Sequence, residues 1–354
     1  MTVTNSSDDY RAVRYEGAGL IDLSSRRGRM LVSGRDAAMF LNGLVTNDVK
    51  NLARGSWIPA VFANVQGRLI AAVRVIHRPD GFLIDTETVT RDRVVDLLSR
   101  FTLAGDFRVA DLTEETGTLS LQGKKSAEIL STVLGQEAAT LERGSVIQSI
   151  FNQKEVAIIR ATHTAEAGFD LFIESGGLKE FEDALWNAGA EAVKDETLEV
   201  LRIEAGIPRF GIDMDEHTVV SETSLDDAIS DKKGCYVGQE IIIRIKHRGH
   251  VAKKMTGVIL EAVWPLEDHA EIIADDHEEI GHITSLTVSP RLDRQIALAY
   301  VKYDYLEESP VWVEHDEKQV RAELESLPMV RGSWYVDDGA TEPEEEVSEE
   351  QASV

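Results

Sequence analysis

The fold available to this chain is limited above all by the order of its periodic segments. Residues 57–76 and 82–85 carry the apolar patterns of strands, and residues 90–101 carry the apolar stripe of an amphipathic helix. Residues 118–189 repeat this mixture of strands, hairpins and helices. We therefore expect an α+β fold with two mixed units, and not a doubly wound parallel sheet.

After Lys254 the pattern changes to short β segments separated by prolines. This change predicts a separate all-β sandwich or barrel. The expected domains are residues 1–250 as two interleaved α+β domains, with about 50–115 as one domain and the flanking parts as the other, residues 251–335 as the β domain, and residues 336–354 as a disordered acidic tail.

Composition is typical of a globular protein in a reducing compartment. Hydrophobic residues make up 43% of the 354 residues, and the sequence holds neither a run of about 18 apolar residues nor a secretory signal. The single cysteine excludes an internal disulfide, so we expect a cytoplasmic protein without membrane partners. A net charge of -26 argues against direct binding of nucleic acid.

That cysteine, Cys235, lies in a basic segment flanked by glycines. Residues 232–254 contain seven Lys or Arg and one acid, a local net charge of +6. Nearby lysines favour the thiolate and so lower the pKa of the thiol, and the local charge suggests an anionic ligand. Other interpretations are a small buried apolar residue, a solvated basic face, and a nucleophilic pair with His247 or His250.

Several common functional signatures are missing. The sequence has no Gly-Lys-Ser/Thr phosphate loop, no complete dinucleotide-binding glycine pattern, no Gly-x-Ser-x-Gly elbow and no His-Glu-x-x-His pair. A lone thiol without closely spaced partners also argues against a metal site formed by this chain alone. The segment around Cys235 therefore carries the strongest functional signal.

This segment supports a resemblance to a known family. Lys233-Gly234-Cys235-Tyr236-Val237-Gly238-Gln239-Glu240 resembles the signature of the YgfZ-type folate-binding proteins, which are relatives of the glycine-cleavage aminomethyltransferase, or T-protein. Further segments that agree in order are Gly19-Leu20-Ile21-Asp22-Leu23-Ser24, Leu44-Val45-Thr46-Asn47-Asp48-Val49, Asn64-Val65-Gln66-Gly67-Arg68, Leu201-Arg202-Ile203-Glu204-Ala205-Gly206 and Arg248-Gly249-His250.

The resemblance implies a fold and a role. The fold would be a ring of three domains, two mixed α+β domains of ferredoxin-like type and a C-terminal β-barrel, with tetrahydrofolate in the central opening. Residues 241–249 would form a helix, although the run Ile241-Ile242-Ile243 by itself favours a strand. The role would be that of an accessory protein in iron–sulfur cluster assembly or repair and iron–sulfur-dependent tRNA modification, with iron–sulfur enzymes or assembly proteins as partners.

The resemblance also implies site residues. Cys235 would act as a nucleophile, a redox thiol or a cluster ligand shared with a partner, and Lys233 would lower its pKa. The donor edge of the pterin needs a carboxylate, for which Asp170 and Glu204 are candidates; the alternatives are a surface acid at a strand end and a surface pair with Arg202. The remaining expected folate contacts are Lys233, Arg244 and Arg248 at the glutamate tail, together with Asn64, Arg202, Gln239 and Glu240.

One departure from the family pattern bears on catalysis. Aminomethyltransferases carry an Asp-Asp pair shortly after the glycines that correspond to Gln66-Gly67, and one acid serves catalysis at the folate nitrogen. The matching residues here are Ala71 and Ala72, or Ile70 in the other register. Because alanine carries no charge, methylene transfer by the T-protein mechanism should be lost. Whether the chain is an enzyme stays open, with aminomethyl transfer and a scaffold without thiol chemistry as alternatives.

Overall fold

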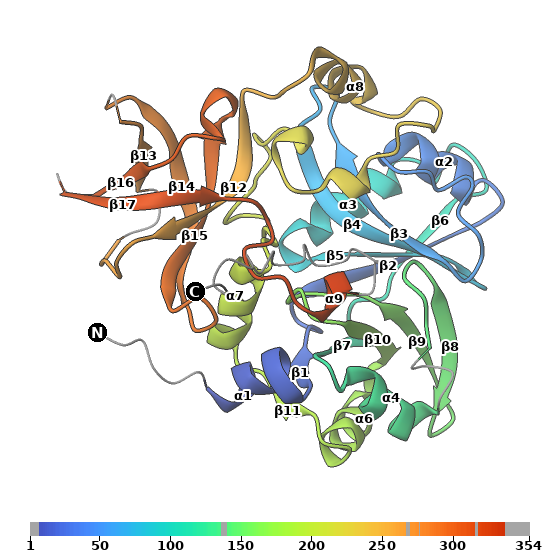
Figure 1. Ribbon diagram of the computed structural model, residues 1–354. Coiled ribbons are helices and arrows are strands. Elements are labelled where there is room, and N and C mark those ends of the chain that lie inside the picture. Colours follow the sequence, from blue (N-terminus) through green and yellow to red (C-terminus); the bar gives the residue numbers. More distant parts are fainter. Residues whose placement is uncertain (1–6, 136–139, 267–269, 276, 316–317, 337–354) are drawn as a thin grey trace, which may run out of the picture.

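A computed structural model describes residues 7–135, 140–266, 270–275, 277–315 and 318–336, without the side chains of 246–248. The acidic tail expected at 336–354 lies outside the described residues, except for Val336. Two α+β units and a β-barrel surround the middle of the molecule (Figure 1). The expected α+β fold with a ring of three domains is therefore confirmed.

The first unit is built on a six-stranded sheet with the order β11-β1-β7-β10-β9-β8. Its strands are β1 (Gly19–Asp22), β7 (Thr116–Gln122), β8 (Val146–Phe151), β9 (Lys154–Arg160), β10 (Gly168–Glu174) and β11 (Glu191–Ala192). Helices α4 (Ser126–Leu134) and α6 (Ser175–Asn187) bury Leu130, Phe181 and Leu185 against this sheet. The apolar stripes of the two helices thus supply one half of the unit's core.

The second unit is built on a five-stranded sheet with the order β3-β4-β5-β2-β6. Its elements are β2 (Arg27–Ser33), α2 (Ala37–Leu44), β3 (Trp57–Ala63), β4 (Leu69–Arg78), β5 (Gly81–Glu87), α3 (Thr88–Ser99) and β6 (Arg108–Asp111). The expected boundary near residue 50 is wrong, because β2 pairs with both β5 and β6. Met30 and Val32 of β2 complete the core that Val94 and Leu98 of α3 cover.

The C-terminal part is a closed barrel with the order β12-β15-β14-β13-β16-β17. Its strands are β12 (Lys253–Leu260), β13 (Glu271–Ile273), β14 (Glu279–Ser289), β15 (Arg294–Lys302), β16 (Val311–His315) and β17 (Lys318–Glu325). Alternate apolar residues such as Val258, Ile272 and Val313 fill its interior. The prediction of a β domain after Lys254 is therefore confirmed, in the form of a barrel.

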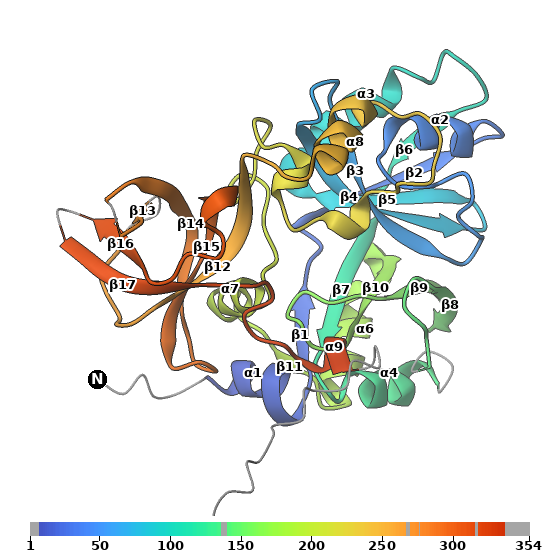
Figure 2. The same ribbon diagram turned by 45° about the horizontal axis from the view of Figure 1, so that its top comes forward.

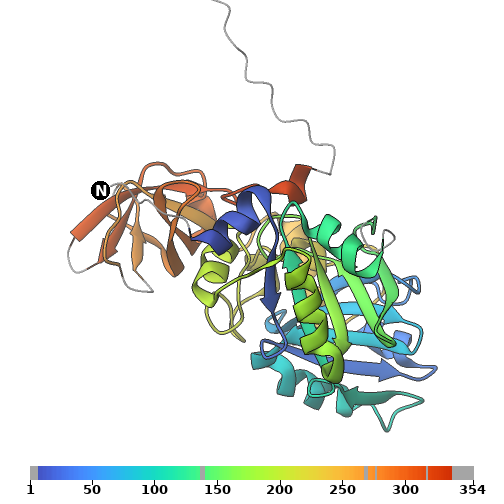
Figure 3. The ribbon, with the colours of Figure 1, turned by 90° about the horizontal axis from the view of Figure 1, so that it is seen from below.

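Connecting segments join the three parts. Helix α7 (Asp195–Glu204) lies between the barrel and the sheets, and the barrel stands beside the two α+β units (Figures 2 and 3). After the barrel the chain returns to the middle of the molecule, where it ends in the short helix α9 (Ser333–Val336). Short elements complete the structure: α1 (Asp8–Arg11), the π-helix η1 (Ala12–Glu16), η2 (Val220–Glu222), η3 (Asp226–Ala228) and η4 (Tyr303–Tyr305).

Helix α8 (Gln239–Arg248) forms where the resemblance implies a helix and the isoleucine run alone favours a strand. Gly238 enters it with a left-handed φ of 84°, and a side chain there would lie 2.5 Å from the carbonyl oxygen of Asn64. Ile242 packs into a cluster with Leu69 and Tyr236. Burial of this apolar face outweighs the strand preference of β-branched residues.

Candidate functional site in the central cavity

A cavity lies where the three domains meet. It consists of two pockets of about 390 Å³ and 500 Å³, which share Arg27, Glu87, His163, Ile207 and Pro208. We call the combined space the central cavity. Sheet strands, the loop after β9 and residues beyond the barrel all contribute to its wall, so no single domain forms it.

The smaller pocket has an apolar and aromatic wall. Trp57 of β3 and Ala72 of β4 line it from the second unit, and Trp334 and Tyr335 line it from α9. Ser333 anchors α9, since its hydroxyl donates to Glu166 at 2.6 Å. Flat apolar surfaces with few polar groups are typical of pockets that hold aromatic ligands.

The larger pocket opens among arginines. Arg26, Arg27, Arg202 and Arg209 line it, against the acids Glu87 and Glu199. Glu199 pairs with Arg202 and, at 3.1 Å, with Arg209. Guanidinium groups bind carboxylates and phosphates through paired N–H donors, so this opening suits the anionic end of a ligand.

A compensated cluster, made of the buried carboxylates of Asp85 and Asp170 and their partly exposed partners Arg27, Arg74 and His163, joins the two sheets. Arg74 Nε donates to Asp85 Oδ2 at 2.7 Å, and its Nη1 pairs with Asp170. Arg27 Nε donates to Asp85 Oδ1 at 3.1 Å, and His163 Nε2 lies 2.9 Å from Asp170 Oδ2. Burial alone would raise the pKa of both carboxyls, but their cationic partners hold it well below the usual range.

Glu87, at the end of β5, differs from this cluster. Its Oε1 accepts a hydrogen bond from the backbone N–H of Phe210 at 3.1 Å. Among the described residues, no Lys, Arg or His nitrogen lies within ion-pair distance of its carboxylate. Burial therefore raises the pKa of Glu87 above its usual value, although the more distant Arg27 opposes the shift.

The two alanines at the expected aspartate positions face opposite ways. Ala71 is completely buried in the core of the second unit, whereas Ala72 lines the central cavity. A β-bulge at this point of the β3–β4 pair breaks the simple alternation of side chains, and Ile70 packs against the same core as Ala71. Of the three residues, only Ala72 lines the cavity. The cavity therefore receives no acid from this part of β4.

Both predicted pterin-binding carboxylates are buried and engaged by other side chains. Asp170 is fully buried and engaged by Arg74 and His163. Glu204 is fully buried as well: Tyr10 donates to it at 2.7 Å, Arg14 pairs with it at 2.7 Å, and Ser289 also bonds to it. Neither Asp170 nor Glu204 lines a pocket of the central cavity. The alternative of a surface pair between Glu204 and Arg202 is wrong, because Glu204 is fully buried.

Two of the basic residues expected to contact the folate, Arg202 and Lys233, are engaged by other groups of the protein. Arg202 does line the central cavity, but it is engaged by Asp213 at 2.7 Å, by Ser285 at 2.7 Å and by Glu199. Lys233 is buried, and its Nζ donates to the carbonyl oxygens of Asn42, Val45 and Asn47.

Burial lowers the pKa of Lys233 to about 8, against an opposing effect of Asp48. An ammonium group has three N–H donors, and here three carbonyl oxygens use them. Lys233 therefore anchors the loop to the end of α2. The expectation that it serves Cys235 or a folate tail is not supported by its contacts.

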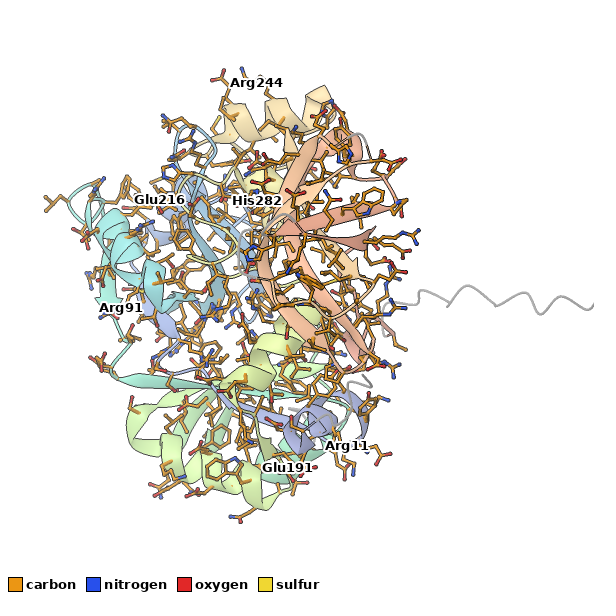
Figure 4. The ribbon with its side chains drawn as sticks, turned by 90° about the vertical axis from the view of Figure 1, so that its left-hand side faces the viewer. Arg11, Arg91, Glu191, Glu216, Arg244 and His282 are labelled. Carbon is orange, nitrogen blue, oxygen red and sulfur yellow. The ribbon has the colours of Figure 1, made fainter. Side chains whose placement is uncertain are left out.

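Cys235 is exposed, which excludes the interpretation as a buried apolar residue. Asn64 closes a turn by accepting N–H bonds from Gln66 and Arg68. Gln239, Glu240 and Arg244 belong to α8, and none of them lines the central cavity. Figure 4 shows Arg244 at the outer end of the molecule, and the side chain of Arg248 lies outside the described part.

Two further observations limit the chemistry. His250 stacks on Tyr303 with ring centres 4.6 Å apart, and the side chain of His247 lies outside the described part of the chain. Within the described residues, no group of three or more His, Cys, Asp or Glu is placed to hold a metal ion. No helix in this part of the chain is long and apolar enough to cross a membrane.

Sequence reasoning missed Glu87, Arg74 and His163. A signal was present for the first two: Asp85 and Glu87 are acids at alternate positions in an otherwise apolar strand, and Arg74 interrupts the neighbouring one. Acids with this spacing share a face of the sheet. His163 carries no comparable signal, because its place at the cavity depends on how the loop after β9 is folded.

Comparison with known proteins places this architecture in a family. Residues 3–233 match the GCVT N-terminal domain, and residues 253–330 match the glycine cleavage T-protein C-terminal barrel domain. Together the two matches cover both α+β units and the barrel. The chain belongs to the glycine cleavage T-protein family.

Individual relatives agree with this assignment. The chain is 31% identical over 324 residues to an aminomethyltransferase of Rubrobacter xylanophilus, covering 91% of this chain and 86% of the relative. It is 28% identical over 309 residues to that of Thermotoga maritima, covering 84% and 82%. The glycine cleavage system aminomethyltransferase T of Bartonella henselae shares the fold, with a TM-score of 0.82, 21% identity and coverage of 92% and 89%.

Proposed function

We propose that this chain binds a reduced folate in the central cavity. The observation that carries the proposal is the polarity of that cavity, with an aromatic wall in the smaller pocket, arginines around the larger one, and the carboxylate of Glu87, which has no ion-pair partner among the described residues, lining both. A folate has the complementary polarity, because a flat ring with N–H donors forms one end and a glutamate tail forms the other. Membership of the T-protein family adds support.

For the role of the bound folate, we propose an accessory function toward iron–sulfur enzymes or their assembly proteins in the cytoplasm. Two features support it. Ala72 faces the cavity where the resemblance places a catalytic acid, so the T-protein mechanism lacks that group. Cys235 is exposed on the surface, where its thiol is accessible to a partner protein.

Folate-dependent aminomethyl transfer is the second candidate role. Relatives that bear the name aminomethyltransferase match the chain over both α+β units and the barrel. The comparisons favour this role over the accessory one. A carboxyl group elsewhere in the cavity would remove the main objection to it.

Titration calorimetry of the purified protein with tetrahydrofolate tests the binding proposal. Ala72→Trp places a large ring in the cavity and should abolish the binding heat. Val65→Trp is the matched control, because Val65 is 70% exposed on a turn. Wild-type protein that gives no heat, or an Ala72→Trp variant that binds like wild type, contradicts the proposal.

The two roles are separated by a genetic experiment and an enzyme assay. In a deletion strain, Cys235→Ala should fail to restore the activity of iron–sulfur enzymes if the accessory role holds, whereas the wild-type gene restores it. Full restoration by Cys235→Ala excludes the thiol-dependent accessory role. Transfer of a methylene group to tetrahydrofolate by the purified protein establishes the second candidate.

A further inference from the structure

A second cavity lies on the barrel side of the molecule, which Figure 4 shows with His282 of the barrel labelled. Its volume is about 640 Å³, and it is lined by the turn after β3, by residues between 211 and 222 and by barrel strands. We call it the barrel cleft. One loop separates it from the central cavity, because Gly211 and Ile212 also line the larger pocket of that cavity and Met214 lines the smaller one.

Tyr300 of β15 lines the barrel cleft, and its buried hydroxyl has no hydrogen-bond partner in the described part of the chain. Ala299 and Val301 on either side fill the barrel interior, so the Tyr300 side chain points out of the barrel. Thr218 lies nearby, but its hydroxyl is already bonded to Asp215 as donor and as acceptor. Burial raises the pKa of Tyr300, so its hydroxyl stays protonated and can donate.

Two cations of the barrel cleft also have no ion-pair partner among the described residues. Lys253 Nζ lies 4.7 Å from the centre of the Tyr300 ring, and Arg68 is exposed at the turn before β4. A lysine side chain is flexible, so Lys253 can turn from the ring to a ligand bound beside it. The cleft therefore offers O–H and N–H donors together with two positive charges.

Glu222 of η2 adds a carboxylate to these donors. Its Oε2 accepts one long hydrogen bond, of 3.4 Å, from the backbone N–H of Val219, and its Oε1 has no partner among the described residues. Burial raises the pKa of Glu222, and Lys253 and Arg68 are close enough to oppose the rise. The acceptor and the two cations therefore lie within reach of one small ligand.

Structural roles explain the other acids of the barrel cleft but not this set of groups. Asp213 is bonded to Arg202 and Ser285, and Asp215 accepts N–H bonds within its own turn. Contact with solvent would account for an exposed arginine. It does not account for a buried tyrosine hydroxyl without a partner, because such a group costs free energy.

We propose that the barrel cleft binds an α-amino acid. The carboxylate of the ligand accepts hydrogen bonds from Tyr300 and from the two cations, Lys253 and Arg68. The ammonium group of the ligand donates to Glu222. A phosphate or a simple carboxylate would use the same donors but would leave Glu222 facing a second negative charge. This inference goes beyond folate binding, because it concerns a different cavity.

Thermal unfolding of the whole chain with each of the standard amino acids tests the inference. At about ten times its dissociation constant, an amino acid that binds should raise the melting temperature by about 2–3 °C. Calorimetry then compares that amino acid with its deaminated acid, its decarboxylated amine and inorganic phosphate. Wild-type protein should bind the amino acid at least about tenfold more tightly than each of the three. If no amino acid raises the melting temperature, or if phosphate binds as tightly, the inference is wrong.

Two substitutions test the individual contacts. Glu222→Gln should reduce the preference for the amino acid over its deaminated acid to less than about threefold. Glu216→Gln should preserve this preference, because Glu216 is paired with Arg93 and does not line the cleft. Tyr300→Phe should weaken amino-acid binding about tenfold without lowering the melting temperature of the protein alone, since the hydroxyl that it removes has no partner. A lower melting temperature with unchanged affinity would assign the hydroxyl a structural role and contradict the proposed contact.

Ala72→Trp separates the barrel cleft from the proposed folate site. This substitution fills the central cavity, so the affinity for the amino acid should stay the same. Loss of amino-acid binding in Ala72→Trp would place the amino acid in the central cavity and overturn the inference. If wild-type protein binds the amino acid but not tetrahydrofolate, the inference stands and only the proposed folate binding fails.

Discussion

Two regions of the molecule contrast in how visible they are in the sequence and in what their residues contact. One is the segment around Cys235, residues 230–240, and the other is the central cavity. The segment is conspicuous in sequence, yet its buried lysine bonds to three backbone carbonyls and its helix lines no part of the cavity. The cavity cannot be recognised as a motif in the sequence, because its residues come from separate strands, loops and the last helix. A conspicuous local motif can thus reflect the folding of its own loop, while the wall of a cavity is assembled from distant segments.

A second contrast lies within the cavity. Asp85 and Asp170 are buried with cationic partners, so they hold the sheets together. Glu87 is on the same face without such a partner, so its carboxylate is available to a ligand. Substitution should therefore affect stability in the first group and ligand binding in the second.

The largest effect is expected for Asp170→Asn. Removing this charge takes away one of the two carboxylate partners of Arg74 and the carboxylate partner of His163, and breaking a buried pair in this way costs about 3–5 kcal/mol. Urea unfolding measures the loss, with Glu191→Gln as an exposed control. A loss of less than about 1 kcal/mol would show that the cluster does not hold the sheets together.

Lys233→Met should cause the second largest loss of folding stability. The variant keeps an apolar side chain of similar length but leaves three carbonyl oxygens without their donor, which we expect to cost about 2–3 kcal/mol. Lys232→Met, at the exposed neighbouring position, should change stability by less than about 0.5 kcal/mol. Equal effects of the two substitutions would contradict the anchoring role.

Acid should weaken the compensated cluster. The folded-state pKa values of Asp85 and Asp170 lie below the usual value of 3.8, so their contribution is complete above that pH and is lost as the pH falls further. Urea unfolding between about pH 5 and pH 2 should show a smaller decline for Asp170→Asn than for wild type. Parallel declines of the two proteins would assign the acid sensitivity to other groups.

The smallest effect on ligand binding is expected for Cys235→Ser. The thiol is exposed and α8 lies outside the cavity, so the affinity for tetrahydrofolate should change by less than about twofold. Calorimetry of the two proteins measures this directly. A tenfold loss of affinity would indicate that tetrahydrofolate binds beside the Cys235 segment and not in the central cavity.

The sequence was sufficient for the fold and for part of the site. Apolar periodicity predicted the two α+β units and the β domain, because these patterns are local. It could not place β2, since the pairing of residues 27–33 with β5 and β6 is a long-range contact. The burial of Glu204 could not be predicted for a similar reason, because its partners Tyr10 and Ser289 lie far away in the chain.

The wall of the central cavity likewise depends on long-range contacts that the sequence pattern does not reveal. Whether Ala71 or Ala72 faces the central cavity depends on the orientation of β4, and the position of Glu87 depends on the register between β4 and β5. The family resemblance located the central opening but transferred the pterin contact to Asp170 and Glu204. Their partners Arg74, His163 and Arg14 became visible only in three dimensions.

A crystal structure of the protein with tetrahydrofolate tests the account most directly. We predict that the ring lies in the central cavity beside the aromatic wall of the smaller pocket, and that the tail extends into the larger pocket. A folate bound beside Cys235 and α8, with the central cavity free of it, would contradict the account.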